Sequence, residues 1–253
     1  MEREAMLRTT GANTDTAQPP RRLPPSLEAL VAPEAGMSRQ ARVGGVLLPL
    51  GLAMLFALSA GLSAAVRVNA REATLQELET SGQLATMSDR AIDDAQKAAE
   101  QTFVVKRIAL AIAAPPAWLL LLALGVLIVG WFAKGRTNQL KLSAVFPVAA
   151  AGLLPFAIAD LLETGSTLQR ATLSSAPAPL LTSTLTQMAE ALGHPIVGAA
   201  GKILSAVDVF SLWSAVLVAF GVAAASNIPT RRALVFTLIG WFAFRLIRTV
   251  LLH

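Results

Sequence analysis

The chain has no cysteine, no tyrosine and only two histidines, His194 and His253, among its 253 residues. Without cysteine it forms no disulfide bond, zinc–thiolate site or reactive thiol. Two histidines are too few for a histidine-rich metal site, so we expect no bound metal. The sequence also lacks a glycine-rich phosphate loop and a nucleophile elbow. We therefore expect no enzyme activity and no cofactor.

Charged residues are also scarce, at 15% of the chain, whereas soluble domains average about 25%. Hydrophobic residues make up 54% of the chain, and the mean hydropathy is +0.58. They are concentrated in apolar runs, and a run of about 20 residues is long enough to cross a bilayer as a helix. The runs predict an all-α membrane protein whose membrane domain covers residues 43–253. We expect five transmembrane helices, at about residues 43–66, 108–133, 142–162, 205–225 and 233–252.

Residues 1–42, ahead of the first run, are polar and rich in proline. Because they contain too little apolar surface to fold alone, we predict a disordered tail. A small apolar patch within it, formed by Leu23, Leu27, Leu30 and Val31, is a candidate for docking on another surface. The tail is too long for the n-region of a signal peptide, so the first run is interpreted as a retained span.

Residues 67–107 separate the first two runs and carry seven acidic and six basic residues. Apolar and small residues recur at spacings of three and four from Leu84 onward, which is typical of a helix. Gly82 suits the end of a preceding helix that continues the first span. We predict a helical hairpin that projects from the membrane between spans 1 and 2. It is either a docking surface for a partner or a solvated hairpin that packs on itself.

Small side chains recur at every fourth position in the first and fourth spans. The two sets are Ala53, Ala57, Gly61 and Ala65, and Ser211, Ala215, Ala219 and Ala223. Ridges of this kind let helix backbones approach closely within a membrane. We expect the ridges to pack on each other or on helices of a partner. The alternative interpretation is that alanine and glycine are simply abundant in these runs.

The net charge of +5 is distributed around the apolar runs instead of forming one basic patch. We interpret it as a signal for orientation in the bilayer, and we expect no nucleic-acid partner. If the N-terminus is cytoplasmic, the short cytoplasmic loops are basic, whereas the outer loop of residues 163–193 holds Arg170 alone, as the positive-inside rule predicts. The basic residues of the cytoplasmic loops are Lys134, Arg136, Lys141, Arg231 and Arg232.

Four charged residues, Asp160, Asp208, Arg245 and Arg248, lie within the apolar runs or at their ends. In the orientation above, all four lie near the outer leaflet. An unpaired charge at the bilayer centre costs about 2.5–3.5 kcal/mol. We therefore expect Asp208 to pair with Arg245 or Arg248, with Asp160 in or beside the cluster. The cluster is either a clamp between helices, with the arginines partly snorkelling, or part of an ion or substrate pathway.

A short motif of Asp208, Phe210 and Trp213 opens the fourth run, and a turn with Arg231 and Arg232 follows that run. This arrangement resembles the prokaryotic branch of the Yip family, Ypt-interacting-protein-type membrane proteins, over about residues 40–253. The resemblance implies a five-span scaffold or adaptor without known catalysis, which accompanies membrane partners such as a transporter assembly. The tyrosine-rich signatures of the eukaryotic members are absent, which favours a bacterial plasma membrane.

Two functions remain open. The first is a membrane-embedded adaptor that binds the helices of partners, or of a second copy, through its small-residue faces. The second is a small secondary transporter or channel that uses Asp160, Asp208, Arg245 and Arg248. Secondary transporters commonly consist of two related halves. The sequence shows no such repeat, and five spans divide badly into halves, so the adaptor is favoured.

We predict that the two termini lie on opposite sides of the membrane, because an odd number of helices crosses it. Reporter fusions at the two ends should place the N-terminus in the cytoplasm and the C-terminus outside. Since the chain has no native cysteine, single cysteines placed in each loop give an independent accessibility map. Two reporters found on the same side would contradict the five-span topology.

Overall fold

The structure is a computed structural model that describes residues 23–67, 69–134, 141–169, 184–194, 198, 201, 204 and 207–251. In this part of the chain the regular structure is helical, apart from one isolated β-bridge between Thr184 and Asp208. The expected all-α fold is confirmed. The helices are α1 (Pro25–Val31), α2 (Pro33–Val43), α3 (Leu47–Arg67), α4 (Ala70–Thr80), α5 (Asp89–Lys134), α6 (Leu142–Ala151), α7 (Leu154–Gln169), α8 (Leu185–Ala191), α10 (Val209–Ser226) and α11 (Thr230–Leu251).

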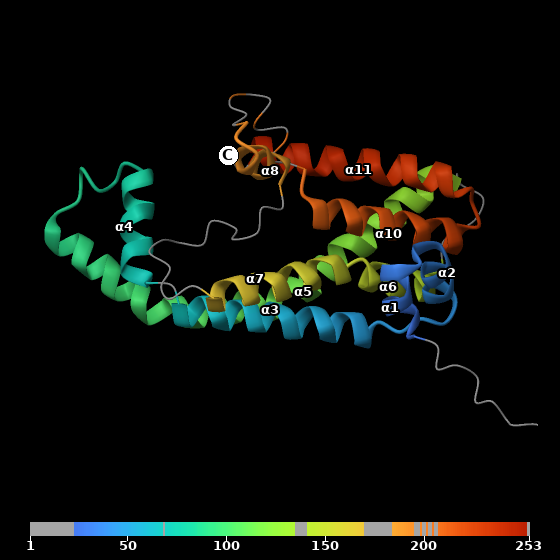
Figure 1. The fold of residues 1–253 in the computed structure, drawn as a ribbon, viewed down its shortest axis with the longest axis horizontal. Helices are drawn as coiled ribbons and strands as arrows, with labels where there is room; N and C mark the ends of the chain where they lie inside the picture. The colour runs from blue at the N-terminus through green and yellow to red at the C-terminus, as the bar shows by residue number, and fades with distance from the viewer. Residues whose placement is uncertain are drawn as a thin grey trace, which may run out of the picture.

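The long helices run alongside one another in alternating directions (Figure 1). α3 packs against α5 and α7, and α10 packs against α6, α7 and α11. Within the described residues, four helical segments are long and apolar enough to cross a membrane. They are Leu47–Arg67, Asp89–Ala133, Leu142–Gln169 and Val209–Ser226. These segments correspond to the first four expected spans, whereas the fifth expected span falls on α11, a 22-residue helix with four arginines that is not among them.

α5 is 46 residues long and continues through Pro115 and Pro116. At 1.5 Å per residue it measures roughly 69 Å, more than twice the roughly 30 Å of a bilayer's hydrocarbon core. Its first part extends past the end of α3, where α4 packs against it (Figure 1). Gly82, at a φ of 70°, lies in the turn between α4 and α5, in a left-handed conformation that glycine adopts without steric cost.

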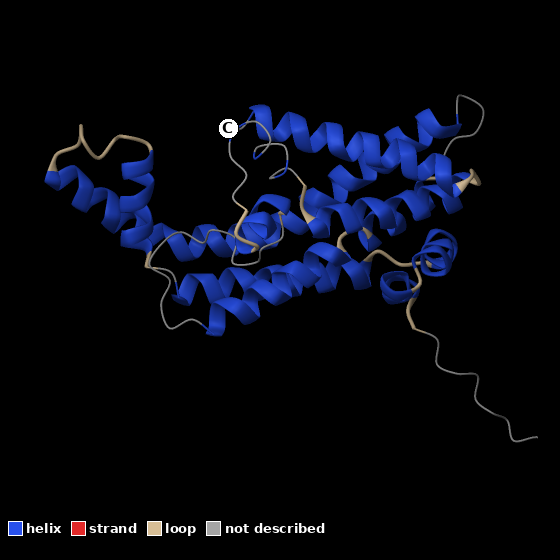
Figure 2. Cartoon of the chain, turned by 45° about the horizontal axis from the view of Figure 1, so that its top comes forward, coloured by secondary structure: helices blue, strands red, loops and turns tan. Residues whose placement is uncertain are grey.

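The predicted disordered tail is wrong for residues 25–42, which form α1 and most of α2, while residues 1–22 lie outside the described part of the chain. In both views α1 and α2 lie beside one end of the bundle (Figures 1 and 2), where α2 contacts α6 and α10. Met37 is fully buried there. Two of the prolines that favoured a tail, Pro25 and Pro33, are the first residues of the two helices, where a missing N–H is tolerated.

The third expected span, residues 142–162, is two helices joined by a break at Gly152 and Leu153. Pro155 lacks the N–H that would continue the hydrogen-bond ladder. The buried Ser214 of α10 donates its hydroxyl to the Gly152 carbonyl at 2.6 Å, so that carbonyl is satisfied in the apolar interior. Because α7 runs on to Gln169, Asp160 lies inside a helix and not at its end, which corrects the expected boundary.

The two small-residue ridges serve different interfaces. The ridge of α3 belongs to a helix that packs on α5 and α7. The ridge of α10 belongs to a helix that also packs on α2 and α6. The α10 ridge is buried throughout, and Gly221 beside it leaves no room for a Cβ because Val148 and Met37 fill the space. Among the described residues α3 and α10 have no extensive direct contact, so the packing of one ridge on the other is not seen there. Both are used within the chain, because the bundle needs close backbone approach at two separate places.

We predict that Gly36→Ala loosens the α1–α2 pair. A Cβ at Gly36 would overlap the backbone of Ala29, and a backbone cannot rotate away as a side chain can. Overpacking of this kind costs about 1–3 kcal/mol, so the midpoint of thermal unfolding in mild detergent should fall. Gly51→Ala is the matched control, since a Cβ there meets open space. Equal midpoints for the two variants would contradict the packing of α1 on α2.

Candidate functional site, a cavity with a charged end

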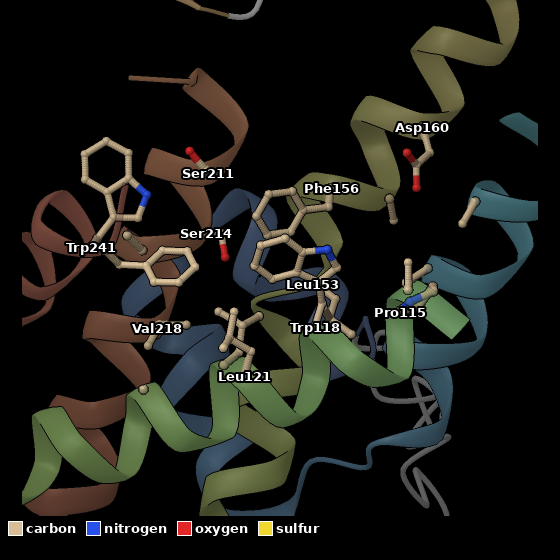
Figure 3. Close-up of a pocket in the computed structure, with 18 of the residues that line it drawn as sticks. Pro115, Trp118, Leu121, Leu153, Phe156, Asp160, Ser211, Ser214, Val218 and Trp241 are labelled. Atoms are coloured by element: carbon tan, nitrogen blue, oxygen red, sulfur yellow. The ribbon is translucent and has the colours of Figure 1, made fainter. Parts of the chain in front are cut away.

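A cavity of about 640 Å³ lies among α3, α5, α7, α10 and α11 (Figure 3). This volume is within the roughly 300–1,000 Å³ typical of small-molecule sites. Much of its wall is apolar, and Leu121, Leu153 and Val218 point into it. Trp118 of α5 stacks on Phe156 of α7, with ring centroids 5.9 Å apart. The cavity therefore has the size and the lining of a binding site for a ligand with a substantial apolar part.

Small residues leave the space for this cavity. Ala53, Ala57 and Gly61 of the α3 ridge line it, together with Gly125 of α5 and Gly240 of α11. A Cβ on Gly125 or Gly240 would meet no atom within 4 Å. The ridge that was expected to bind another helix therefore borders open volume over part of its length, because its side chains are too short to fill the gap between helices.

Four charged side chains line the cavity, and three of them, Arg107, Asp160 and Glu163, define its charged end beside Ser59 and Gly61 of α3. The four are Asp160 and Glu163 of α7, Arg107 of α5 and Arg245 of α11. The two acids lie three residues apart and so share one face of α7. Among the described residues, neither acid forms an ion pair. The Arg107 guanidinium lies 5.3 Å from the centroid of the Phe103 ring, a favourable cation–π contact.

Hydrogen bonds hold α3 and α7 together beside the charged end. The hydroxyls of Ser59 and Thr164 lie 3.0 Å apart, and Thr164 donates to the backbone carbonyl of Asp160 at 2.8 Å. On α5, the backbone at Arg107 lies close to Gly61, where a Cβ would be 3.4 Å from the Arg107 carbonyl oxygen. α3 thus packs against both α7, which carries the two acids, and α5, which carries Arg107.

Of the four charged residues singled out from the sequence, the structure places Asp160 and Arg245 on the same cavity. Asp208 does not line it. Its two carboxylate oxygens instead accept hydrogen bonds from the backbone N–H groups of Phe210, at 3.3 Å, and Ser211, at 3.1 Å, and so cap α10. The side chain of Arg248 lies outside the described part of the structure, so the pairing of Asp208 with Arg245 or Arg248 stays a prediction.

The capping bonds explain two features of the sequence motif. Asp208 is an N-cap residue, which satisfies backbone donors that have no partner within the helix. Trp213, one turn into α10, packs partly buried against the hydrophobic core, and Phe210 is half-buried. The motif therefore has a local structural role at the start of α10, and its residues lie outside the cavity lining.

Five polar or charged lining residues were not singled out from the sequence, namely Arg107, Glu163, Ser214, Thr237 and Trp241. Arg107 and Glu163 were assigned to loops because they lie just beyond the expected spans. Thr237 and Trp241 were overlooked within the fifth run. A signal was nevertheless present, because Thr237, Trp241 and Arg245 recur at every fourth position and so form a polar stripe on one face of α11.

The described residues contain no group of three or more histidine or acidic side chains that could hold a metal ion. Comparison with known protein families, curated proteins and solved structures gives no match for this chain. The geometry of the cavity and of the helices around it is therefore the basis for any inference about function.

We predict that Asp208 acts mainly through its capping bonds. Asp208→Ala removes both acceptors and should cost about 0.5–2 kcal/mol of stability. Asp208→Asn keeps a capping oxygen while removing the charge, and asparagine caps about as well as aspartate. Thermal unfolding in detergent should therefore show Asp208→Asn close to the parent and Asp208→Ala clearly below it. Equal destabilisation by both variants would instead indicate that the charge matters, as an ion pair with an arginine requires.

Proposed function

We propose that this chain is an integral membrane adaptor that works by binding partners and not by catalysis. The observation that carries the proposal is the continuity of α5, which extends well beyond the expected second span at residues 108–133. A helix that leaves the membrane without a break presents its free end rigidly. Because both small-residue ridges are used inside the bundle, we place the partner site on this extension and not on the ridges.

The extension and α4 form the projecting hairpin, here called the arm and defined as residues 70–107. Arg71 of α4 donates a hydrogen bond to Glu100 of α5 at 3.0 Å, and this bond and the charge of Glu100 raise the pKa of Arg71. The pair is exposed and adds little stability. The hydrogen bond between Arg71 and Glu100 instead fixes the position of α4 against α5. The rest of the arm exposes charged side chains of both signs, which suits a polar partner surface.

We further propose that α11 is the fifth span and that the N-terminus is cytoplasmic. The alternating helix directions support this topology, since α2 and the first residues of α6 and α11 lie at the same end of the bundle (Figure 1). Arg42 is in the last turn of α2, Lys141 precedes α6, and Arg231 and Arg232 are in the first turn of α11. These basic residues lie in or beside the short connections between helices, which are the segments that the positive-inside rule counts. A bacterial plasma membrane and a place in the Yip family rest on the resemblance of the segment that opens α10, and both stay predictions.

A small transporter or channel is the second candidate function. The observation in its favour is the cavity itself, which combines an apolar wall with acidic and basic side chains, among them Asp160 and Arg245. Charged residues within membrane segments commonly mark ion or substrate pathways. Transport requires that the cavity open in turn to each side. Solute or ion flux in liposomes that contain only this protein, abolished by Asp160→Asn, would support this function.

We predict that a partner is captured through the arm. A single cysteine at the exposed Glu79 of α4, labelled with a photo-crosslinker in native membranes, should give one discrete adduct. The matched control is Leu55→Cys on α3, which is 58% exposed but faces the expected lipid region. The same label there should give no such adduct. If Glu79→Cys captures nothing while the purified protein shows flux in liposomes, the result contradicts the adaptor function and supports the transporter function.

A further inference from the structure

We propose that the cavity binds one zwitterionic glycerophospholipid with a primary ammonium headgroup, taken from the surrounding bilayer. The proposal goes beyond the adaptor function and does not depend on it. Three observations carry it: the balance and depth of the charges, two buried donors without acceptors, and the place where the cavity opens.

The charged end of the cavity lies at the depth of lipid headgroups. Arg107 directly precedes the second expected span, and Asp160 and Glu163 flank the end of the third, so all three lie near the boundary of the hydrocarbon layer. The remaining wall extends from there into the apolar part of the bundle, past Trp118 and Phe156. A molecule bound here would have its polar group at the interface and its apolar part inside, as a lipid does.

The lining charges are two acids and two arginines, which match a headgroup that carries both signs. An arginine guanidinium binds a phosphate through two parallel hydrogen bonds. The carboxylates of Asp160 and Glu163 accept hydrogen bonds, and a primary ammonium has three N–H groups to donate. A quaternary ammonium has none and is typically recognised by an aromatic cage. An anionic lipid without an amine would leave the two acids uncompensated.

Two hydrogen-bond donors of α11, Trp241 and Thr237, lie deeper in the cavity. Trp241 is about one turn and Thr237 about two turns before Arg245. Thr237 is only 6% exposed, and within the described structure neither its hydroxyl nor the indole N–H of Trp241 has a hydrogen-bond partner. Both residues line the cavity. A buried donor without an acceptor costs about 1–3 kcal/mol. Trp241 lies four residues from Arg245, roughly 6 Å along the helix, which suits a donor to an ester carbonyl below a phosphate.

The cavity opens toward the surrounding lipid. Five of its large hydrophobic lining residues are also exposed on the outside of the bundle, among them Leu124 at 53%, Ile128 at 47% and Phe244 at 39%. All five belong to α5 or α11, so these two helices form the lipid-exposed side of the cavity. A lipid can therefore enter sideways from the bilayer, with one acyl chain in the cavity and the other outside it.

The test uses the full chain, purified in mild detergent and titrated with four lipids under native mass spectrometry. The lipids are phosphatidylethanolamine, phosphatidylcholine, phosphatidylglycerol and diacylglycerol. We expect one saturable phosphatidylethanolamine per chain, bound about tenfold more tightly than the others. Gly240→Leu places a side chain in the cavity and should weaken this binding about tenfold. Gly51→Leu is the matched control, because Gly51 also has open space but does not line the cavity.

Two conservative variants test the headgroup and the donors separately. Asp160→Asn with Glu163→Gln should abolish the preference for phosphatidylethanolamine over phosphatidylglycerol. Trp241→Phe keeps an aromatic ring but removes the indole N–H, and it should weaken binding roughly fivefold through one lost hydrogen bond. Tighter binding of phosphatidylglycerol than of phosphatidylethanolamine would overturn the headgroup assignment. Equal binding of all four lipids, unchanged in Gly240→Leu, would overturn the site, and neither result bears on capture of a partner by the arm.

Discussion

Backbone polar groups within a hydrocarbon layer have no water to bond, so each must find a partner inside the protein. This constraint is most severe where α6 ends and α7 begins, because two helices meet there in the middle of an expected span. The hydroxyl of Ser214 satisfies the Gly152 carbonyl. Nearby, the buried Gln40 of α2 donates to the carbonyls of Pro147 and Gly45, both at 3.0 Å. Side chains of α10 and α2 thus bond to carbonyls at the break and inside α6, and α2 becomes part of the bundle.

The same few contacts determine which surfaces remain for binding. Close approach of α10 to its neighbours requires small residues, and a Cβ on Gly152 would lie 2.8 Å from the Val218 side chain. On α3 the small residues approach α5 and α7 but do not fill the space before α11, and that space is the cavity. Larger side chains such as Leu55 and Leu62 face outward, where lipid can solvate them. The small residues therefore produce volume inside the bundle and not a ridge on its outer surface.

α5 links the two proposed functional regions. Its first part forms one side of the arm and is tied to α4 by Arg71 and Glu100. Its later part lines the cavity from Arg107 to Val129. Because the helix is continuous between them, the proposed partner site and the proposed lipid site lie on one helix. The two proposals are therefore compatible, because α5 carries residues of both the arm and the lipid site.

The helical class and four of the membrane segments could be read from the sequence, because long apolar runs have few alternatives in a bilayer. The four charged residues were also identified, and two of them, Asp160 and Arg245, do line one cavity. Their partners could not be read, since sequence distance carries no information on how helices rotate and pack. The tertiary structure alone decided that Asp208 caps its own helix. It also decided that a proline-rich stretch folds as α1 and α2, because burial against α6 and α10 supplies the apolar contact that these residues lack by themselves.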